Sequence, residues 1–483
     1  MNYSMIRYIL SSVICFVGIF LLLPAATAGI YQEKEGFLYL IIGLACMLIG
    51  FWGRRRKPKS SVFYSKEGFA AVALSWIILS LIGALPMYLT GEFPSYIDAL
   101  FETISGFTTT GSSILSDVET LSRGTAFWRC FTHWIGGMGV LVFIMAVMPL
   151  SDSSSMHLMR AESPGPSVGK LVPKVKTTAM ILYGIYVVFT VIEIIALLIA
   201  GMPLFDSMTL TFGTVGTGGF GLLNSSIASY STAVQIIITV FMIICSINFT
   251  VYYMFLIKRP KEALMCEEMR YYLLIVFGSA LLIAFNIRAS FASFGKAFQQ
   301  AIFQVASVIS TTGFATADFN LWPEFSRMIL VLLMFVGACA GSTGGGFKVS
   351  RLIIMVKSVR NEIMSVTHPR SVQKVHMDGR RIPDNVVKTV LCYLAGYVVI
   401  LIVSVLLISL DNFDMTTNFT AVMATFNNVG PGLNRVGPTG NFGGFSVLSK
   451  LVLMFDMLVG RLELYPICLL YTSPSPRDST SSR

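Results

Sequence analysis

Four short segments of the chain share one pattern: IDALFETISGFTTTG (97–111), FDSMTLTFGTVGTGG (205–219), QQAIFQVASVISTTG (299–313) and TTNFTAVMATFNNVG (416–430). They align without gaps, and each of them ends in glycine. A small residue stands six positions before each glycine (Ser105, Gly213, Ser307 and Ala424), and a small polar residue stands two positions before it (Thr109, Thr217, Thr311 and Asn428). A pattern that recurs in register indicates internal repeats.

Each of these segments lies between two long apolar runs and is itself too short and too polar to cross a bilayer, which takes about 20 apolar residues in a helix. Irregular backbone is tolerated at membrane depth only where protein buries it or where it lines water. We therefore expect each repeat to consist of a helix, a half-helix, an extended re-entrant loop and a second helix. Four such units are expected to surround one pore in quasi-fourfold symmetry.

The composition places the whole chain in a membrane. Its 483 residues are 54% hydrophobic and 12% charged, with a mean hydropathy of +0.73, whereas a soluble domain has about 25% charged residues. The first apolar run, with Arg7 before it and Ala26-Thr27-Ala28 after it, has features of a cleaved signal peptide. A second apolar run that ends in a basic cluster favours a retained helix pair, so we expect an all-α polytopic protein with ten spanning helices and four re-entrant loops.

The repeats suggest how the chain is divided. The predicted units are an N-terminal transmembrane helix pair (1–60), pore repeat 1 (61–160), pore repeat 2 (161–265), pore repeat 3 with an interrupted second helix (266–370), pore repeat 4 (371–467) and a tail of foreign character (468–483). The tail is set apart because its composition changes within a spanning run.

The formal charge of +10 is read as membrane topology rather than as nucleic-acid binding. Tracing the chain helix by helix puts most of the 35 basic residues on one side, in the stretches 54–66, 160–176, 258–270 and 348–388. Loops rich in Lys and Arg stay in the cytoplasm. The amino terminus and these linkers are therefore expected to face inward.

The four loops have the composition of a site for a dehydrated monovalent cation, because rings of backbone carbonyls can replace the water shell of potassium. A terminal glycine permits positive φ and a close approach of the backbone, and the half-helix dipoles favour positive charge at their carboxyl ends. The candidate filter residues include no Asp or Glu; they are Thr108, Thr109, Thr110, Gly111, Gly216, Thr217, Gly218, Gly219, Ser310, Thr311, Thr312, Gly313, Asn427, Asn428, Val429 and Gly430. A fourfold duplication that only holds helices together is the plainer alternative.

Together with SGFTTTGSS, STTGFAT and FNNVGPGLN, the motifs HWIGGMG (133–139), GACAGSTGGGFK (337–348) and GRLE (460–463) resemble the Trk/Ktr/HKT superfamily of potassium transport proteins. The resemblance runs from about residue 5 to Pro466, and the two extra helices look more like TrkH than like the shorter KtrB members. It implies potassium uptake across the bacterial inner membrane, with K⁺ as the transported ion and no organic cofactor in this chain. It also implies a homodimer and a cytosolic, TrkA-like nucleotide-binding ring as partner.

One apolar run is interrupted by residues that cannot form a straight helix: Gly341, Ser342, Thr343, Gly344, Gly345 and Gly346. A kink that eases packing is one explanation. The resemblance implies instead an intramembrane loop that blocks the pore, reached by Arg461; snorkelling is the alternative for this arginine. Glu463 is expected to be a structural partner or a contact of the pore helices, and Asp456 is a candidate to neutralise Arg461.

The remaining polar residues suggest no catalytic site. His133 is expected to pack between helices, and Asp98 and Asp206 are expected to begin half-helices. The glycines near 216–221 and GSTGGGFK (341–348) lack the strand–helix context of nucleotide-binding motifs. Most of the eight cysteines lie inside apolar runs and are expected to be buried small hydrophobic residues, without a disulfide framework or a metal cluster. No Ser/His/Asp or Cys/His constellation with catalytic logic is present in the sequence, so we expect a protein that is not an enzyme. Two alternatives stay open: a proton- or sodium-coupled symporter, with Glu102 as its candidate carboxylate, and a membrane scaffold or sensor without flux.

Overall fold

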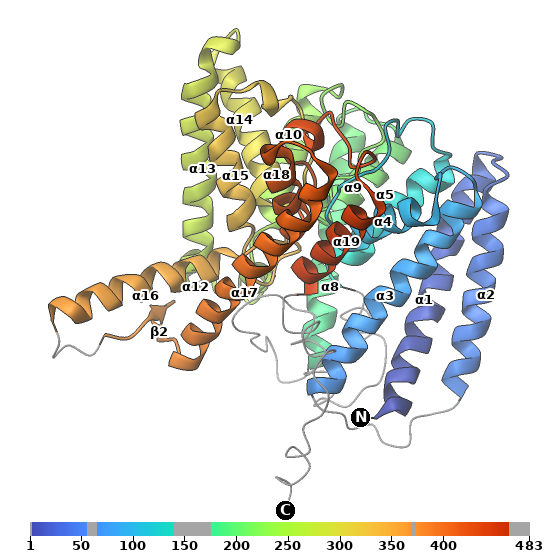
Figure 1. The fold of residues 1–483 in the computed structure, drawn as a ribbon, viewed down its shortest axis with the longest axis horizontal. Coiled ribbons are helices and arrows are strands. Elements are labelled where there is room, and N and C mark those ends of the chain that lie inside the picture. The colour runs from blue at the N-terminus through green and yellow to red at the C-terminus, as the bar shows by residue number, and fades with distance from the viewer. Residues whose placement is uncertain (1, 56–64, 140–174, 369–372, 463–483) are drawn as a thin grey trace, which may run out of the picture.

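A computed structural model describes residues 2–55, 65–139, 175–368 and 373–462 (Figure 1). Two N-terminal helices, α1 (Tyr3–Ile30) and α2 (Gly36–Arg55), pack against each other, and α1 also packs on α3 and α5 of the first repeat. The predicted boundaries near residues 60, 160, 370 and 467 lie outside the described residues. The boundary at 265 falls between two helices, α12 (Pro260–Leu264) and α13.

Four helix–half-helix–helix units follow, as the repeats predict. They are α3 (Ser65–Leu89), α4 (Tyr96–Phe107) and α5 (Arg123–Gly137); α8 (Val175–Ile199), α9 (Leu204–Val215) and α10 (Thr232–Cys245) with α11 (Phe249–Leu256); α13 (Glu267–Ile287), α14 (Phe294–Ile309) and α15 (Glu324–Val336); and α17 (Asp384–Ile408), α18 (Met415–Phe426) and α19 (Val447–Leu462). The half-helices are α4, α9, α14 and α18.

The four units close into a ring. Each half-helix packs on the second helix of the preceding unit: α9 on α5, α14 on α10, α18 on α15, and α4 on α19. The last of these contacts joins the fourth unit to the first, although some 350 residues separate Asp98 from Lys450 in sequence. The quasi-fourfold arrangement predicted from the glycine-terminated segments is therefore present.

The remaining elements are short or lie on one side of the ring. Short 3₁₀ turns are η1 (Arg288–Ser290), η2 (Phe319–Leu321), η3 (Ser409–Asp411) and η4 (Asn434–Val436). In Figure 1, α16 (Val349–Thr367) and an antiparallel hairpin of β1 (His376–Met377) and β2 (Arg380–Arg381) extend on the same lower side as the amino terminus. The hairpin and the end of α2 hold part of the basic residues that the sequence places on one side.

Six described helices are long and apolar enough to cross a membrane, and the pair α10–α11, bent by 88°, raises this number to seven. The other helices of the expected ten are α5, α15 and α19. Of these, α5 ends three residues before a segment outside the described ranges, α19 ends directly before another, and α15 ends at the interrupted stretch 337–348. The four half-helices are 12 to 16 residues long, too short to span a bilayer.

Local sequence determines where the half-helices begin. Ser95, Ser293 and Asp414 are N-caps whose side-chain oxygens accept a backbone N–H of the first turn. Asp98 also accepts a hydrogen bond from the Ser95 hydroxyl, and Asp206 lies in the first turn of α9. The expectation that these two aspartates begin half-helices is therefore confirmed.

Candidate ion-binding loops

All four half-helices end in the same hydrogen-bonded turn. The residue before each terminal glycine donates its N–H to the carbonyl of the small residue five positions earlier, at 2.8 Å for Thr110 to Ser105 and 2.9 Å for Thr312 to Ser307. The residue two before the glycine donates to the carbonyl three positions back, at 3.1 to 3.2 Å. This pair of bonds is a Schellman motif, which satisfies the last carbonyls of a helix. The small residues noted in the sequence therefore supply the acceptor carbonyls.

The turn requires an unusual backbone at the polar position. Thr109, Thr217, Thr311 and Asn428 have φ of 55°, 55°, 59° and 54°, in the left-handed region. Asparagine tolerates this region, but a β-branched residue there is a genuine outlier. Functional sites are where such strained residues cluster.

The terminal glycines bring the four loops together around a common axis. Gly111, Gly219, Gly313 and Gly430 have φ of 80°, 82°, 83° and 98°. A Cβ on each would lie closer than 3.0 Å to a carbonyl oxygen of the next loop: that of Gly218, Thr312, Val429 and Thr110 in turn. The relation is cyclic, and it excludes any side chain at these four positions without a backbone shift.

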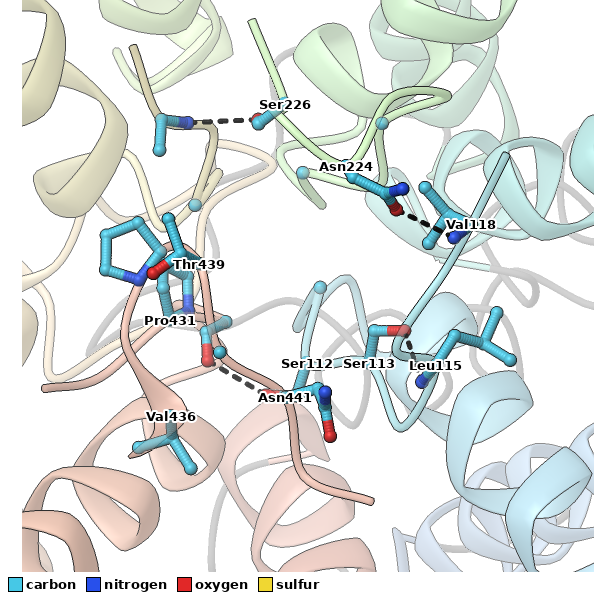
Figure 2. A pocket seen from close by; sticks show the side chains of 18 of the residues that line it. Ser112, Ser113, Leu115, Val118, Asn224, Ser226, Pro431, Val436, Thr439 and Asn441 are labelled. Carbon is cyan, nitrogen blue, oxygen red and sulfur yellow. Dashed lines mark hydrogen bonds between the residues drawn. The ribbon is translucent and has the colours of Figure 1, made fainter. Parts of the chain in front are cut away.

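A polar pocket of about 150 Å³ opens above these glycines (Figure 2). It is lined by residues of all four repeats, including the four terminal glycines. Among its described lining residues there is no Asp or Glu, and Arg129 is the only one with a full charge. This wall therefore offers backbone and hydroxyl oxygen rather than carboxylate, as the sequence predicts for the loops.

Hydrogen bonds join consecutive repeats around the rim of the pocket. Val118 N–H donates to the Asn224 side chain at 2.9 Å, and Ala315 N–H donates to Ser226 at 3.1 Å (Figure 2). The third and fourth repeats meet where Asn434 N–H donates to Asn320 at 2.9 Å. The fourth and first meet at two bonds, from Phe442 N–H to the Ser113 carbonyl and from Ser112 Oγ to the Gly430 carbonyl. The rim is thus closed by four different seams.

The first seam also carries a titratable group outside the helices. Asn224 Nδ2 donates to Asp117 Oδ1 at 2.8 Å, and Glu119 N–H donates to the same carboxyl at 3.0 Å. These bonds to the charged form lower the pKa of Asp117 below its ordinary value. The carboxylate therefore stays ionised on the exposed rim.

His133 on α5 connects the first two loops. Its Nδ1 lies 2.7 Å from the Gly106 carbonyl, and its Nε2 accepts Phe220 N–H at 3.2 Å. These contacts fix one neutral tautomer, because one nitrogen must donate while the other accepts. The ring is buried against Phe220, so the prediction that His133 packs between helices is confirmed.

Arg129 lies one turn before this histidine on α5, and it forms a buried ion pair with Glu102 of α4. Arg129 Nε donates to Glu102 Oε1 at 2.6 Å, while Arg129 Nη1 donates to the Gly221 carbonyl at 3.0 Å. Glu102 also accepts hydrogen bonds from Ser113 Oγ and Ile114 N–H at 2.9 and 3.0 Å. The pair therefore holds the outer stems of loops 1 and 2. Sequence reasoning considered Glu102 only as a symport carboxylate and missed Arg129.

The stretch 337–348 forms a loop that reaches the inner side of loops 3 and 4. Gly345 N–H donates to Thr311 Oγ1 at 2.6 Å. A Cβ on Gly344 would meet the Ser310 carbonyl, and a Cβ on Gly345 would meet the Asn427 carbonyl. The candidate gate residues and the candidate filter residues are therefore in direct contact.

Arg461 at the end of α19 fastens this loop to α5. Its Nη1 donates to the Thr343 carbonyl at 2.8 Å, and its Nη2 donates to the carbonyls of Gly136 and Gly137 at 2.5 and 2.7 Å.

Asp456 does not take the predicted position as the counter-ion of Arg461. Its Oδ1 accepts a hydrogen bond from Ser404 at 2.7 Å, and its Oδ2 has no hydrogen-bond partner in the part of the chain described. The reason is that Arg461 is directed at backbone carbonyls of the loop. Glu463 lies outside the described residues.

Other predicted features concern cysteine and metal. The described cysteines are free thiols, of which four are buried, while Cys15 and Cys266 are partly exposed and Cys392 is exposed. Within the described ranges, no group of three or more His, Cys, Asp or Glu side chains could hold a metal ion. Cys468 lies in the tail, outside the described residues.

Comparison with known proteins gives consistent matches over nearly the whole chain. A family model described as "TrkH: Cation transport protein" matches residues 39–483. The Trk system potassium uptake protein TrkH of Salmonella typhimurium is 35% identical over 472 residues, which cover 95% of this chain and 96% of the relative. The Trk system potassium uptake protein TrkG of Escherichia coli is 31% identical over 455 residues, which cover 93% of each chain.

Among solved structures, the crystal structure of the potassium transporter TrkH from Vibrio parahaemolyticus matches with a TM-score of 0.88 and 30% sequence identity. The match covers 98% of this chain and 99% of that chain, and it confirms the predicted fold class. These relatives are named as transport proteins, in agreement with the prediction that the chain is not an enzyme. The chain belongs to the TrkH family of cation transport proteins.

Proposed function

We propose that the chain mediates potassium uptake through a single gated pore whose filter is formed by the four glycine-terminated loops. The observation that carries the proposal is the cyclic contact of each terminal glycine with a carbonyl of the next loop. Such a ring presents backbone oxygen, which suits a dehydrated potassium ion. The proposed filter residues are the sixteen named from the sequence, four from each loop.

The electrostatics of the ring support a monovalent cation. Four half-helices point their carboxyl ends toward the loops, and each end contributes a partial negative charge. No carboxylate lines the described wall of the outer pocket. Weak, distributed attraction of this kind permits an ion both to enter and to leave.

We propose that the loop 337–348 is the gate. Its tip lies against Ser310 and Asn427, at the inner ends of two filter loops, and Arg461 and Thr311 hold it there. A loop in this position obstructs the path below the filter. Opening requires the tip to leave these contacts.

Coupled symport is the alternative, and the contacts of Glu102 weigh against it. A proton-carrying carboxylate has to exchange between partners, whereas Glu102 is fully buried, paired with Arg129 and bonded to two groups of loop 1. Its position suits a fixed support of the filter. We therefore favour a pore over an alternating-access carrier.

The wider assembly is proposed from the family. We propose a homodimer in the bacterial inner membrane with its amino terminus in the cytoplasm, together with a nucleotide-binding ring that contacts the basic inner segments. The relatives from Salmonella typhimurium and Escherichia coli are named as parts of a Trk system. The side on which α16 and the hairpin lie is the one that such a ring would meet.

The test is rubidium uptake into proteoliposomes that contain the purified protein alone, with competition by potassium or sodium. Gly111→Ser is expected to lose the preference for potassium, because the new side chain meets the Gly218 carbonyl and the φ of +80° is unfavourable. Gly184→Ser, on an exposed face of α8 with open space around it, is the matched control. Unchanged potassium-over-sodium discrimination in folded Gly111→Ser would overturn the filter assignment, and absence of uptake by the wild type would favour a scaffold or sensor.

A further inference from the structure

A carboxylate outside the predicted site closes the base of the gate loop. Glu268 lies in the first turn of α13 and is 3% exposed. Its Oε1 accepts Ala340 N–H at 2.8 Å and Ser350 N–H at 3.0 Å. One oxygen atom therefore bridges the two ends of the loop.

Together with these two bonds at its base, the loop is held by contacts at its tip and at its side. At its tip, Gly345 bonds Thr311, and Thr343 is bonded by Arg461. At its side, Phe249 N–H donates to the Gly341 carbonyl at 3.0 Å. Among these residues, only Glu268 contacts both the segment that enters the loop, at Ala340, and the segment that leaves it, at Ser350. Its loss would remove one hydrogen bond from each end of the loop, while Val349 N–H still donates to the Ala338 carbonyl at 3.2 Å.

In its ionised form, Glu268 accepts stronger hydrogen bonds than a backbone carbonyl does. A hydrogen bond to an ionised acceptor contributes roughly twice as much as a neutral one. Lys348, between the two donors, is 1% exposed and interacts electrostatically with Glu268. Lys348 Nζ also donates to the Gly344 carbonyl inside the loop. The carboxylate is therefore compensated within the loop that it holds.

The same helical turn is joined to the hairpin on the lower side in Figure 1. Glu267, the neighbouring residue, pairs with Lys357 of α16 and donates its N–H to Asp378 between β1 and β2 at 2.7 Å. Glu267 thus faces the hairpin while Glu268 faces the loop. A movement of the hairpin that displaces this turn would displace the base of the loop as well.

We propose that Glu268 is a positioning residue that clasps the base of the loop 337–348 and keeps it beneath the filter. The proposal rests on the gating function proposed above. Removing the clasp favours the open position, and loss of a hydrogen bond to a charged acceptor shifts such an equilibrium by on the order of tenfold. Among the hydrogen bonds of the described residues, none joins Glu268 to a proposed filter residue, so ion preference is expected to persist.

The experiment compares rubidium uptake by Glu268→Ala, Glu268→Gln and Ser350→Pro in proteoliposomes. Ser350→Pro removes one donor instead of the acceptor, in the first turn of α16 where proline is tolerated. Glu268→Ala and Ser350→Pro are each expected to raise uptake by on the order of tenfold, and their combination should not exceed Glu268→Ala. Glu268→Gln keeps an acceptor oxygen, so a smaller rise is expected.

Glu262→Ala, which removes an exposed carboxylate on nearby α12, is the matched control and should equal the wild type. Wild-type uptake in folded Glu268→Ala and Ser350→Pro would overturn the clasp. If Glu268→Ala does not fold, Ser350→Pro and Glu268→Gln give the same comparison. Failure of the filter is distinguishable, because it appears as lost potassium-over-sodium preference in the wild type, whereas failure of the clasp leaves that preference intact.

Discussion

Threonine in the left-handed region is the most unusual feature at the scale of single residues. Glycine would fit these turns with less strain, since an L-residue with a Cβ loses about 1–2 kcal/mol there. The hydroxyls offer a reason for threonine. Thr311 Oγ1 accepts the gate contact from Gly345, and Thr217 Oγ1 donates to the Gly216 carbonyl at 2.7 Å. Of the three threonines, only Thr311 is thereby joined to the loop 337–348, since Thr217 bonds its own loop and the Thr109 hydroxyl has no hydrogen-bond partner among the described residues.

The Arg129–Glu102 pair gives a prediction that separates a pore from a symporter. Glu102→Gln alone leaves a buried charge without its partner and is expected to lower the free energy of unfolding by about 3–5 kcal/mol. The double variant Glu102→Gln/Arg129→Met removes both charges and should recover most of that loss. Thermal unfolding of the detergent-solubilised protein measures the difference.

Rubidium uptake by the same double variant decides the mechanism. A pore is expected to keep potassium-selective uptake without this carboxylate, within about tenfold of the wild type if one supporting contact is lost. A carrier that needs Glu102 to move a proton would lose uptake altogether. Complete loss of uptake in a stably folded double variant would therefore favour symport.

At the scale of elements, two breaks in the helical pattern satisfy each other. The chain bends by 88° between α10 and α11, and the loop 337–348 is hydrogen-bonded to residues at this bend. Cys339 N–H donates to the Ser246 carbonyl at 3.1 Å, and Thr343 Oγ1 donates to the Cys245 carbonyl at 3.1 Å. Backbone groups freed at membrane depth must find such partners. The bend in repeat 2 and the loop in repeat 3 therefore satisfy each other's free backbone groups and form one hydrogen-bonded structure.

A substitution of Arg461 tests whether the loop 337–348 is held closed. Arg461→Gln cannot reproduce three charged hydrogen bonds to carbonyls of Thr343, Gly136 and Gly137. Uptake of rubidium is expected to rise by about tenfold or more, because the hydrogen bonds of Arg461 stabilise the closed position of the loop and their loss shifts the equilibrium toward the open position. Potassium-over-sodium preference should be retained. Arg259→Gln, an exposed arginine on the lower side, serves as control, and lowered or unchanged uptake in folded Arg461→Gln would contradict a gate held shut by this residue.

The elements were largely predictable and their long-range contacts were not. The four turns follow from local sequence, since a Schellman motif needs only a small residue, a tolerant residue and a following glycine within one segment. Glu268 carried no such signal. It resembles an ordinary first-turn acid of α13, and its partners stand 72 and 82 positions later. The Asp456–Arg461 pairing failed for the same reason, because five residues of separation said nothing about the loop that Arg461 reaches.

At the scale of the whole molecule, the ring depends on its final seam. Lys450 of α19 pairs with Asp98 of α4 at 2.7 Å, and both side chains are 11% exposed. Asp98→Ala or Lys450→Ala is expected to cost about 3–5 kcal/mol of unfolding free energy, since each leaves one charge buried and unpaired. The double variant should cost less than the sum, as a double-mutant cycle by thermal unfolding would detect. Additive losses would indicate that the pair does not couple the first and fourth repeats.

The overall architecture was predictable because repetition in sequence implies repetition in space. Gly111 and Gly430 are far apart in the chain, yet their shared pattern was sufficient to place them around one axis. The seams were not predictable in this way, since each of the four uses different residues. His133, for example, binds Gly106 and Phe220, and that pairing has no counterpart among the aligned positions.

The cyclic contact of the terminal glycines has a further consequence for how such a protein can change. In a channel assembled from four identical subunits, every mutation is present in quadruplicate. Here all four loops belong to one polypeptide, so a substitution at Gly219 adds a single side chain, which meets the Thr312 carbonyl of the next loop, and leaves the other three terminal glycines unchanged. In the proposed filter, ion preference would therefore change in steps, one loop at a time, and the loops can diverge in sequence as Thr312 and Val429 already have.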